Sequence, residues 1–222
     1  MTRNKIITVI FSSLLLFSSA GCQVIPAVLE KMFPKQKVPP KFVLPRDKVL
    51  LVFPDDLQNP VTYPPIKRRM AEKIVATLIE RKAISKAVDY DELLKLESNR
   101  DDFNLLSTPK IARLVGAQVV IYISIDRFSL KDNPIDTLWR GTLSGRVKVV
   151  DVEKGQIWPD ETGGFPIEIV EPPTDNAYES YGVELANKLA DDLAEKVCDL
   201  FSFHYVLRSR MREKQGIGTS GR

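Results

Sequence analysis

The sequence Val-Val-Ile-Tyr-Ile-Ser-Ile at residues 119–125 is the strongest β-strand pattern in the chain. Valine and isoleucine occupy most of its positions, and only Tyr122 and Ser124 interrupt the apolar run. Such a run is typical of a strand in the middle of a sheet that helices cover. We therefore expect a central, helix-covered strand at these residues.

A short helix is expected directly before this strand. Residues 107–109, Ser-Thr-Pro, supply a capping hydroxyl and a proline suited to a first helical turn. Gly116 is the residue type at which helices commonly end, in a left-handed conformation. The buried face of this helix should consist of Ile111, Ala112, Leu114 and Val115.

Further elements alternate on the N-terminal side. Residues 48–53 form an apolar run that ends at Pro54-Asp55-Asp56, as a buried strand followed by a turn would. Pro64-Pro65 should begin a helix, because apolar residues then recur at every fourth position. These residues are Ile66, Met70, Ile74 and Leu78. A second short strand is expected at residues 87–90.

On the C-terminal side, residues 138–152 alternate between apolar and polar side chains, which predicts a strand. A turn at residues 153–156 should return the chain as a hairpin. A further strand at 165–170 and a long helix from 177 to about 205 complete the order. The sequence therefore predicts a single α/β domain with a central mixed β-sheet, flanking helices and a long C-terminal helix.

Two phrases in this order resemble a known type of bacterial envelope protein. They are the helix-stop-strand phrase IARLVGAQVVI at 111–121 and the hairpin VKVVDVEKGQIW at 147–158. They are similar to sequences in the curli-secretion lipoprotein, the lipoprotein activator of penicillin-binding proteins and the N-terminal domain of the Tol-system periplasmic protein. The resemblance covers roughly residues 46–204 and implies a fold, since none of its motifs is catalytic.

The N-terminus has the layout of an export signal. Arg3 and Lys5 precede an apolar core at residues 6–17, and small residues then lead to Cys22. The core is too short to span a bilayer comfortably. The string Ser19-Ala20-Gly21-Cys22 resembles a bacterial lipobox. That resemblance implies cleavage after Gly21, then a diacylglycerol thioether and an N-acyl chain such as palmitate on Cys22.

This pattern divides the chain into a signal peptide at 1–21, a lipidated Cys22 with a Pro/Lys-rich linker at 22–45, an α/β domain at 46–206 and a basic, disordered tail at 207–222. The charge follows the same division. Residues 42–206 contain 21 basic and 27 acidic side chains, whereas both ends are basic. The basic ends are expected either to remain solvated or to contact anionic lipid or other envelope polyanions. Gln23, directly after the lipidated residue, is similar to outer-membrane lipoproteins.

Composition excludes several classes of function. The 222 residues are 44% hydrophobic and 27% charged, which is typical of a globular domain. Two cysteines and one histidine are too few for a cysteine-rich zinc site or most triad chemistry. The domain has no basic, aromatic face, so nucleic acid is not an expected partner. We expect no metal, no cofactor and no catalytic residue.

The acidic residues offer one weak candidate site. Asp55 and Asp56 follow the end of a buried strand, where open α/β sheets often bind ligands. A turn is the simpler role for both residues. The string GIGTSG at 216–221 has the spacing of a dinucleotide-binding loop, but no strand pattern precedes it, so we interpret it as coincidence.

The remaining candidates have structural explanations. Cys198 should be a small buried residue of the last helix rather than a reactive thiol. His204 is expected near the end of that helix, in a packing or charge role. Trp139, Trp158 and Phe165 either pack in the core or form an exposed aromatic patch.

Three functions are compatible with this sequence. The favoured one is a non-enzymatic, lipid-anchored cell-envelope protein, exported to the periplasmic side of the outer membrane, whose domain binds another envelope protein. The second is a carbohydrate-binding or hydrolytic protein that uses carboxylates from separate elements. The third is a subunit of an oligomeric secretion assembly, with a second copy of the chain as partner.

Overall fold

The computed structural model describes residues 35–131, 137–175 and 181–207. The chain divides into two compact units. The larger unit, Pro39–Phe203, is the α/β domain that the sequence predicts. The smaller unit contains a two-stranded ribbon, in which β1 (Lys35–Val38) pairs antiparallel with β8 (His204–Leu207).

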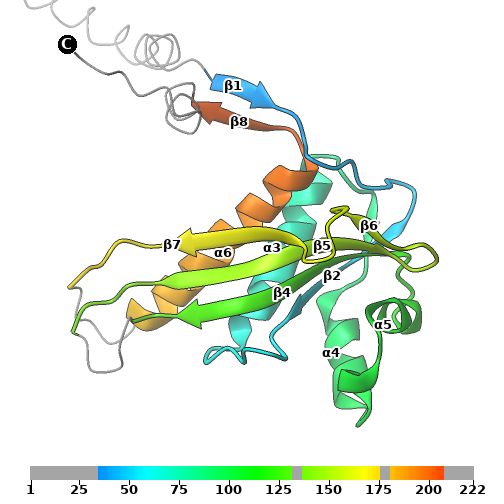
Figure 1. Ribbon diagram of the computed structural model, residues 1–222, viewed down its shortest axis with the longest axis horizontal. Helices are drawn as coiled ribbons and strands as arrows, with labels where there is room; N and C mark the ends of the chain where they lie inside the picture. The colour runs from blue at the N-terminus through cyan, green and yellow to red at the C-terminus, as the bar shows by residue number, and fades with distance from the viewer. Residues whose placement is uncertain (1–34, 132–136, 176–180, 208–222) are drawn as a thin grey trace, which may run out of the picture. The chain divides into compact units, whose positions relative to one another are not determined.

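The domain is built on a six-stranded mixed sheet (Figure 1). Its strand order is β3-β2-β4-β5-β6, and β7 also pairs with β5. The pairings of β2 with β3 and β4 are parallel, and those of β5 with β4, β6 and β7 are antiparallel. The strands are β2 Val49–Asp55, β3 Lys86–Ala87, β4 Val119–Ser129, β5 Thr142–Asp151, β6 Gly155–Trp158 and β7 Phe165–Val170.

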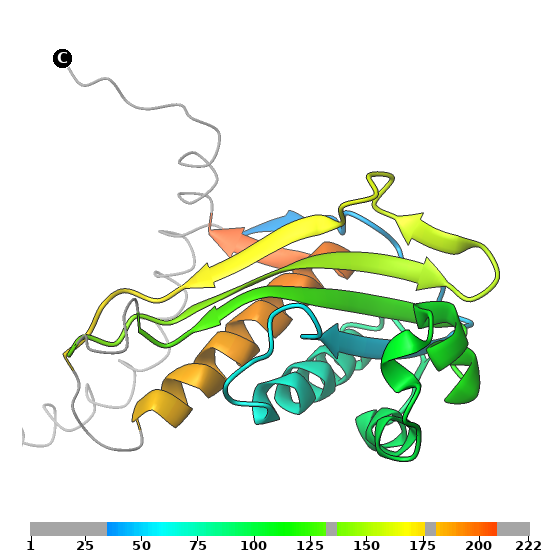
Figure 2. The ribbon, with the colours of Figure 1, turned by 60° about the horizontal axis from the view of Figure 1, so that its bottom comes forward.

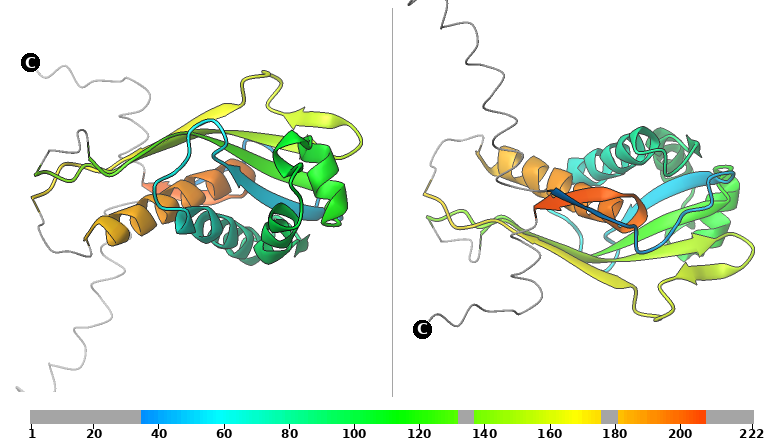
Figure 3. Two further views of the ribbon diagram at one scale, coloured as in Figure 1. Left: turned by 90° about the horizontal axis from the view of Figure 1, so that it is seen from below. Right: turned by 90° about the horizontal axis from the view of Figure 1, so that it is seen from above.

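The central position of β4 confirms the expectation drawn from residues 119–125, but the two long helices cover only one of its faces. Ile121, Ile123 and Ile125 are buried beneath the helical layer, whereas Tyr122 and Ser124 point to the opposite face and are partly exposed. Among the described residues, neither long helix lies on that second face (Figures 2 and 3). The expectation of helices on both faces is wrong here. A strand with one buried face and a few apolar residues on the other has nearly the same sequence pattern as a strand buried on both faces.

Two long helices form the covering layer. They are α3 (Pro65–Glu80) and α6 (Tyr181–Phe201), which lie side by side beneath the sheet (Figures 2 and 3). The predicted apolar stripe of α3 is fully buried, and the leucines of α6 face it. Salt bridges join the two helices at their solvent side, with Arg69 Nη2 2.6 Å from Asp191 Oδ2 and Arg81 Nη1 2.8 Å from Asp199 Oδ1. Both long helices therefore pack together on one face of the sheet. Shorter elements contact the other face.

The smaller elements lie at the end of the sheet where β4 begins. They are α4 (Tyr90–Ser98), the 3₁₀ helix η1 (Phe103–Leu105) and α5 (Thr108–Leu114). Gly116 follows α5 with a φ of 78°, so the predicted left-handed helix end is confirmed. Two details of the prediction are wrong, since the Ser107 side chain makes no capping hydrogen bond and Leu114 is 47% exposed.

The last helix ends earlier than its sequence pattern predicts. Ser202 donates both its hydroxyl and its backbone N–H to the Cys198 carbonyl, at 2.7 and 2.9 Å, which closes the final turn. His204 therefore begins β8 instead of lying near a helix end. Part of the expected linker also carries structure, because residues 35–38 form β1 and Leu44 is buried in the domain core.

A buried carboxylate fixes the turn between β5 and β6. The side chain of Asp151 accepts a hydrogen bond from Lys48 Nζ at 2.5 Å and from the backbone N–H groups of Glu153 and Lys154 at 2.9 and 3.1 Å. The hydrogen bond from Lys48 is the largest cause that lowers the pKa of Asp151, to about 2. The ionised carboxylate thus joins the start of β2 to the hairpin.

Replacing Asp151 with asparagine is expected to lower the free energy of unfolding at neutral pH by about 2 kcal/mol, because charged hydrogen bonds are lost. The pKa of Asp151 is about 2 in the folded chain, against about 3.9 for an unfolded aspartate. The stabilisation is therefore present above about pH 4 and is lost as the pH falls toward 2. Urea unfolding between pH 2 and 7 should show that the variant loses less stability than the wild type as the pH is lowered. The exposed-turn variant Asp160→Asn should keep the wild-type pH dependence.

Candidate functional site

Asp56 has the turn role that the sequence left open. Its side chain accepts a hydrogen bond from the Val61 backbone N–H at 3.0 Å and from Lys67 Nζ at 2.6 Å. Partial burial alone would raise the pKa of Asp56, but these hydrogen bonds outweigh it and lower the pKa. Asp56 thereby ties the loop after β2 to the first turn of α3.

Asp55 points elsewhere, onto the open face of the sheet. Its Oδ1 accepts the Leu57 backbone N–H at 3.0 Å, and its Oδ2 accepts the Tyr122 hydroxyl at 2.5 Å. The two adjacent carboxylates therefore serve different partners and do not form a shared site. Both side chains border a small cavity of about 200 Å³, but only Asp55 also lines the larger groove on the open face.

Tyr122 is the link between Asp55 and the aromatic part of this face. Burial, followed by the hydrogen bond to Asp55, raises the pKa of the Tyr122 phenol. The phenol therefore stays protonated at neutral pH and acts as a hydrogen-bond donor. Its ring meets Phe53 edge to face, with centroids 5.6 Å apart, and Phe53 meets Phe103 in the same way at 6.2 Å.

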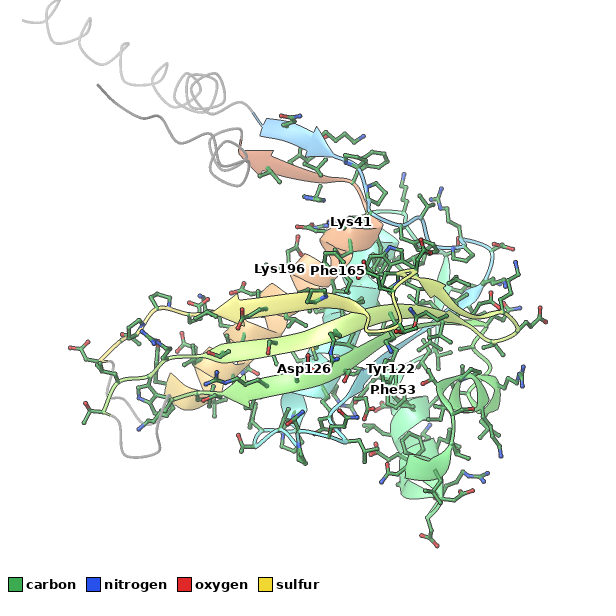
Figure 4. All side chains as sticks on the ribbon, in the orientation of Figure 1. Lys41, Phe53, Tyr122, Asp126, Phe165 and Lys196 are labelled. Carbon is green, nitrogen blue, oxygen red and sulfur yellow. The ribbon has the colours of Figure 1, made fainter. Side chains whose placement is uncertain are left out.

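These three rings border a groove of about 570 Å³ on the open face, which we call the sheet-face groove. Figure 4 shows Phe53 and Tyr122 next to each other on this face. The strands supply the floor, and η1 with the start of α5 supplies one wall. The groove is lined by Phe53, Asp55, Leu57, Phe103, Asn104, Leu106, Ser107, Thr108, Pro109, Ile111, Tyr122, Lys148, Val150, Gly155 and Gln156.

The lining of the sheet-face groove suits binding better than hydrolysis. It contains one carboxylate, Asp55, and one ammonium, Lys148, together with amides and hydroxyls. Glycoside hydrolysis ordinarily requires two carboxylates facing each other across the bond that is cleaved. The groove instead combines an aromatic floor with a few polar groups, which is the usual composition of a recognition site.

Large apolar side chains stand at the rim of the groove. Leu57 lines the groove and is 55% exposed, and Leu105, between the lining residues Asn104 and Leu106, is 87% exposed. Large exposed apolar side chains next to a recessed aromatic floor are a common feature of protein-binding surfaces. Neither leucine belongs to the hydrophobic core or packs against it, so core packing does not explain why a large apolar residue stands at either position.

Cys198 lies where the sequence placed it, inside α6. Its side chain is fully buried and its thiol approaches the Ile74 carbonyl oxygen of α3 at 3.7 Å. Burial raises the pKa of the Cys198 thiol to about 12. The prediction of an inert packing role is therefore confirmed.

The three aromatic residues that the sequence grouped together lie in two places. Trp158 stacks on Phe165 and meets Phe201 edge to face, with centroids 5.4 Å apart in both cases. Trp139 instead packs against Tyr181, with centroids 5.8 Å apart. They do not form one exposed patch, and the packing alternative holds for both groups.

Several predicted features lie outside the described residues. These are the cleavage site at Gly21, the lipidation site at Cys22 and the GIGTSG string at 216–221. Within the described ranges, no three His, Cys, Asp or Glu side chains are grouped as metal ligands would be. Each helix in those ranges is either too short or too polar to cross a bilayer.

The sequence contained two weak signals for the sheet-face groove, and one of them was Asp55, from its place after a buried strand. The other was the pair Tyr122 and Ser124, whose hydroxyls alternate with the isoleucines of the strand and mark a face that is not fully buried. Phe103 gave no signal, because it lies in a short irregular segment between two helices. Its place beside Phe53 depends on how that segment crosses the sheet.

The comparisons with known proteins concern the fold. No protein-family model and no curated protein matches the chain. Among solved structures, a PelC variant from Paraburkholderia phytofirmans, crystallised as a dodecamer, is similar with a TM-score of 0.42 and 14% identity, covering 76% of this chain and 98% of that one. Lipoprotein GNA1162 from Neisseria meningitidis is similar with a TM-score of 0.38 and 16% identity, covering 66% of this chain and 97% of that one.

Proposed function

We propose that this chain is a non-enzymatic, lipid-anchored protein of the bacterial cell envelope. In this proposal Cys22 carries the lipid, and the α/β domain binds a segment of another envelope protein in the sheet-face groove. The observation that carries the binding role is the open face of the sheet, where Phe53, Phe103 and Tyr122 form an aromatic floor.

The anchor is supported by the N-terminal sequence. A charged start, a short apolar core and small residues precede Cys22, which stands where a lipoprotein signal peptidase would leave it as the first residue. Several acyl groups on Cys22 would anchor the polypeptide durably in a membrane. Gln23 favours the outer membrane, and an export signal implies a domain facing the periplasm. The narrower resemblance to the curli-secretion, penicillin-binding-protein-activator and Tol types remains a prediction.

The chemistry of the groove favours a partner segment with one aromatic or branched aliphatic side chain flanked by polar groups. The apolar side chain would lie on the three rings, and Asp55, Asn104, Lys148 and Gln156 would bind the polar groups around it. This arrangement follows the usual anatomy of protein interfaces, with an apolar centre and a polar rim.

Assembly through the edge of the sheet is the less favoured alternative. Among the described strands, β7 pairs only with β5, so its other side is an edge. Pro166 in this strand has no N–H to donate, and Lys196 Nζ of α6 donates to the Glu168 carbonyl oxygen. Both features are known to hinder the addition of a further strand. A second copy of the chain is therefore more plausible as a ligand of the groove than as a strand added at β7.

The proposal predicts a cross-link that depends on position and on the anchor. A photoreactive phenylalanine analogue at Leu57 should cross-link the chain to one other protein in intact cells. Cys22→Ala should abolish labelling with an alkyne fatty acid and reduce the cross-link at least tenfold, because the domain is no longer held near its partner. Mass spectrometry of the cross-linked band would identify the partner.

The matched control places the same analogue at Val183, which is 46% exposed but lies on α6, on the other side of the sheet. It should give little cross-linking. Equal products from both positions would contradict a groove-specific partner. Unchanged fatty-acid labelling of Cys22→Ala would contradict the anchor, whatever the cross-linking result. A cross-link between two copies of the chain would show that the partner is a second copy, in a homo-oligomer.

A further inference from the structure

A small cavity lies next to the sheet-face groove, at the end of β2. It has a volume of about 200 Å³, and five of its lining residues also line the groove. These shared residues are Phe53, Asp55, Leu57, Phe103 and Asn104. A segment bound in the groove can therefore extend a neighbouring side chain into the small cavity.

The small cavity carries negative charge that the described residues do not balance. Three carboxylates line it, from Asp55, Asp56 and Glu97, against one ammonium, from Lys67. Lys67 Nζ is 2.6 Å from Asp56 Oδ1, so these two charges offset each other. Asp55 accepts hydrogen bonds from the Tyr122 hydroxyl and from a backbone N–H, which are both neutral. Glu97 forms no ion pair within the described ranges, so two negative charges remain.

The Tyr90 hydroxyl also lines this cavity without a hydrogen-bond partner. Tyr90 is 6% exposed, and none of the described residues forms a hydrogen bond with its hydroxyl. Every fully buried side-chain oxygen that the structure describes does have such a partner, so the hydroxyl is a part of Tyr90 that remains accessible. Burial, and then the charges of Glu97 and Asp56, raise the pKa of the phenol, as expected for a hydroxyl that faces these carboxylates. Arg68, the cation beside the ring, is already paired with two carboxylates outside the cavity.

These groups are suited to a primary ammonium. An ammonium has three N–H donors, and Asp55, Glu97 and the Tyr90 hydroxyl are three separate acceptors. The rings of Phe53 and Phe103 in the wall would add cation–π attraction. A guanidinium, by contrast, pairs best with both oxygens of one carboxylate, and both oxygens of Asp55 already accept a hydrogen bond. The cavity therefore favours a lysine side chain over an arginine side chain.

We propose that the small cavity binds the ammonium of a lysine in the partner segment, next to the apolar residue that lies in the sheet-face groove. This inference rests on the proposed function, because the groove holds the segment that carries the lysine. It narrows the partner to proteins that expose an aromatic or branched aliphatic residue beside a lysine. The charge also adds specificity, since an acidic side chain at the same place would be repelled.

The test follows the methyl groups of two leucines by NMR in the full chain, purified in a non-ionic maltoside detergent. Leu93 lines the small cavity and not the groove, whereas Leu106 lines the groove and not the small cavity. The probe is the blocked dipeptide acetyl-Phe-Lys-amide, and its matched control is acetyl-Phe-norleucine-amide, which lacks the ammonium. Both should shift Leu106. The lysine probe should do so at about tenfold lower concentration and should shift Leu93 as well. Added salt should remove most of this difference.

Two variants test the acceptors of the small cavity. Glu97→Gln should weaken binding of the lysine probe about fivefold and leave the norleucine probe unchanged, because a hydrogen bond to a charged group is lost. Tyr90→Phe keeps the ring and removes only the hydroxyl, and it should weaken the lysine probe about threefold. The control Glu92→Gln removes an exposed carboxylate of the same helix that does not line the cavity, and it should behave as the wild type.

Failure of the groove and failure of the small cavity give different results. A Leu106 methyl group that neither probe shifts would contradict the proposed function, and the inference with it. A shifted Leu106 with equal affinity for the two probes would overturn the lysine site alone. The site is also overturned if Glu92→Gln weakens the lysine probe as much as Glu97→Gln does. If butylammonium alone binds as tightly as the lysine probe, the ammonium does not have to come from a partner segment, and the inference fails.

Discussion

Ile121→Asp is expected to leave no folded domain. Ile121 is fully buried near the start of β4, where this strand pairs with both β2 and β5 and packs against the helical layer. An aspartate there would place an unpaired carboxylate among the apolar side chains of the hydrophobic core. The cost of such burial is several kcal/mol, comparable with the whole stability of a domain this size. Circular dichroism of residues 23–222, expressed without the predicted signal, should show the loss of cooperative unfolding.

The matched control for this experiment is Lys148→Asp, which introduces the same side chain on the open face. Lys148 lies on β5 directly opposite Tyr122, the residue after Ile121. The two substituted positions are therefore close together in the sheet but lie on opposite faces. The unfolding free energy of Lys148→Asp should change by no more than about 1 kcal/mol, because water can solvate the new carboxylate. If Ile121→Asp were as mild as Lys148→Asp, β4 would not be the centre of the domain.

Gly145→Ala is expected to have the second-largest effect, a loss of about 3 kcal/mol or more in the free energy of unfolding. A Cβ atom on Gly145 would lie 2.4 Å from the backbone oxygen of Ser124. Backbone cannot rotate away as a side chain can, so β4 and β5 would have to separate. This close approach occurs next to an irregularity in the pairing, between Ile125 and Arg127.

Urea unfolding of Gly145→Ala should be compared with that of Gly163→Ala. A Cβ on Gly163 meets no atom within 4 Å, so the control should stay within about 0.5 kcal/mol of the wild type. A Gly145→Ala variant as stable as the control would mean that β4 and β5 are further apart at this point than the structure places them.

Local patterns predicted the parts of the fold that depend on local physics. The four-residue spacing of Ile66, Met70, Ile74 and Leu78 identified α3, since those positions fall on one side of a helix. The apolar run at 119–125 identified the central strand, and Gly116 identified the end of the helix before it. In each case the residues that form the element are close together in the sequence.

The features that the sequence did not predict depend on distant pairings. The strand β1 has the sequence Lys-Gln-Lys-Val, which has no strong strand pattern, and it forms a ribbon only because residues 204–207 lie beside it. The same holds for the groove. Asp55 was found from its place after a strand, but its hydrogen bond with Tyr122 follows from the register between β2 and β4.

The one-sided cover of the sheet separates two kinds of evolutionary constraint within single strands. Along β4, alternate residues belong either to the packed layer against α3 and α6 or to the open face. A substitution at Ile121 or Ile123 must satisfy packing against the helices, whereas one at Ser124 does not face that requirement. If the proposed function holds, point mutations on the open face would change binding specificity in small steps while the chain still folds. Such a division favours the divergence of this domain toward new partners without a redesign of its core.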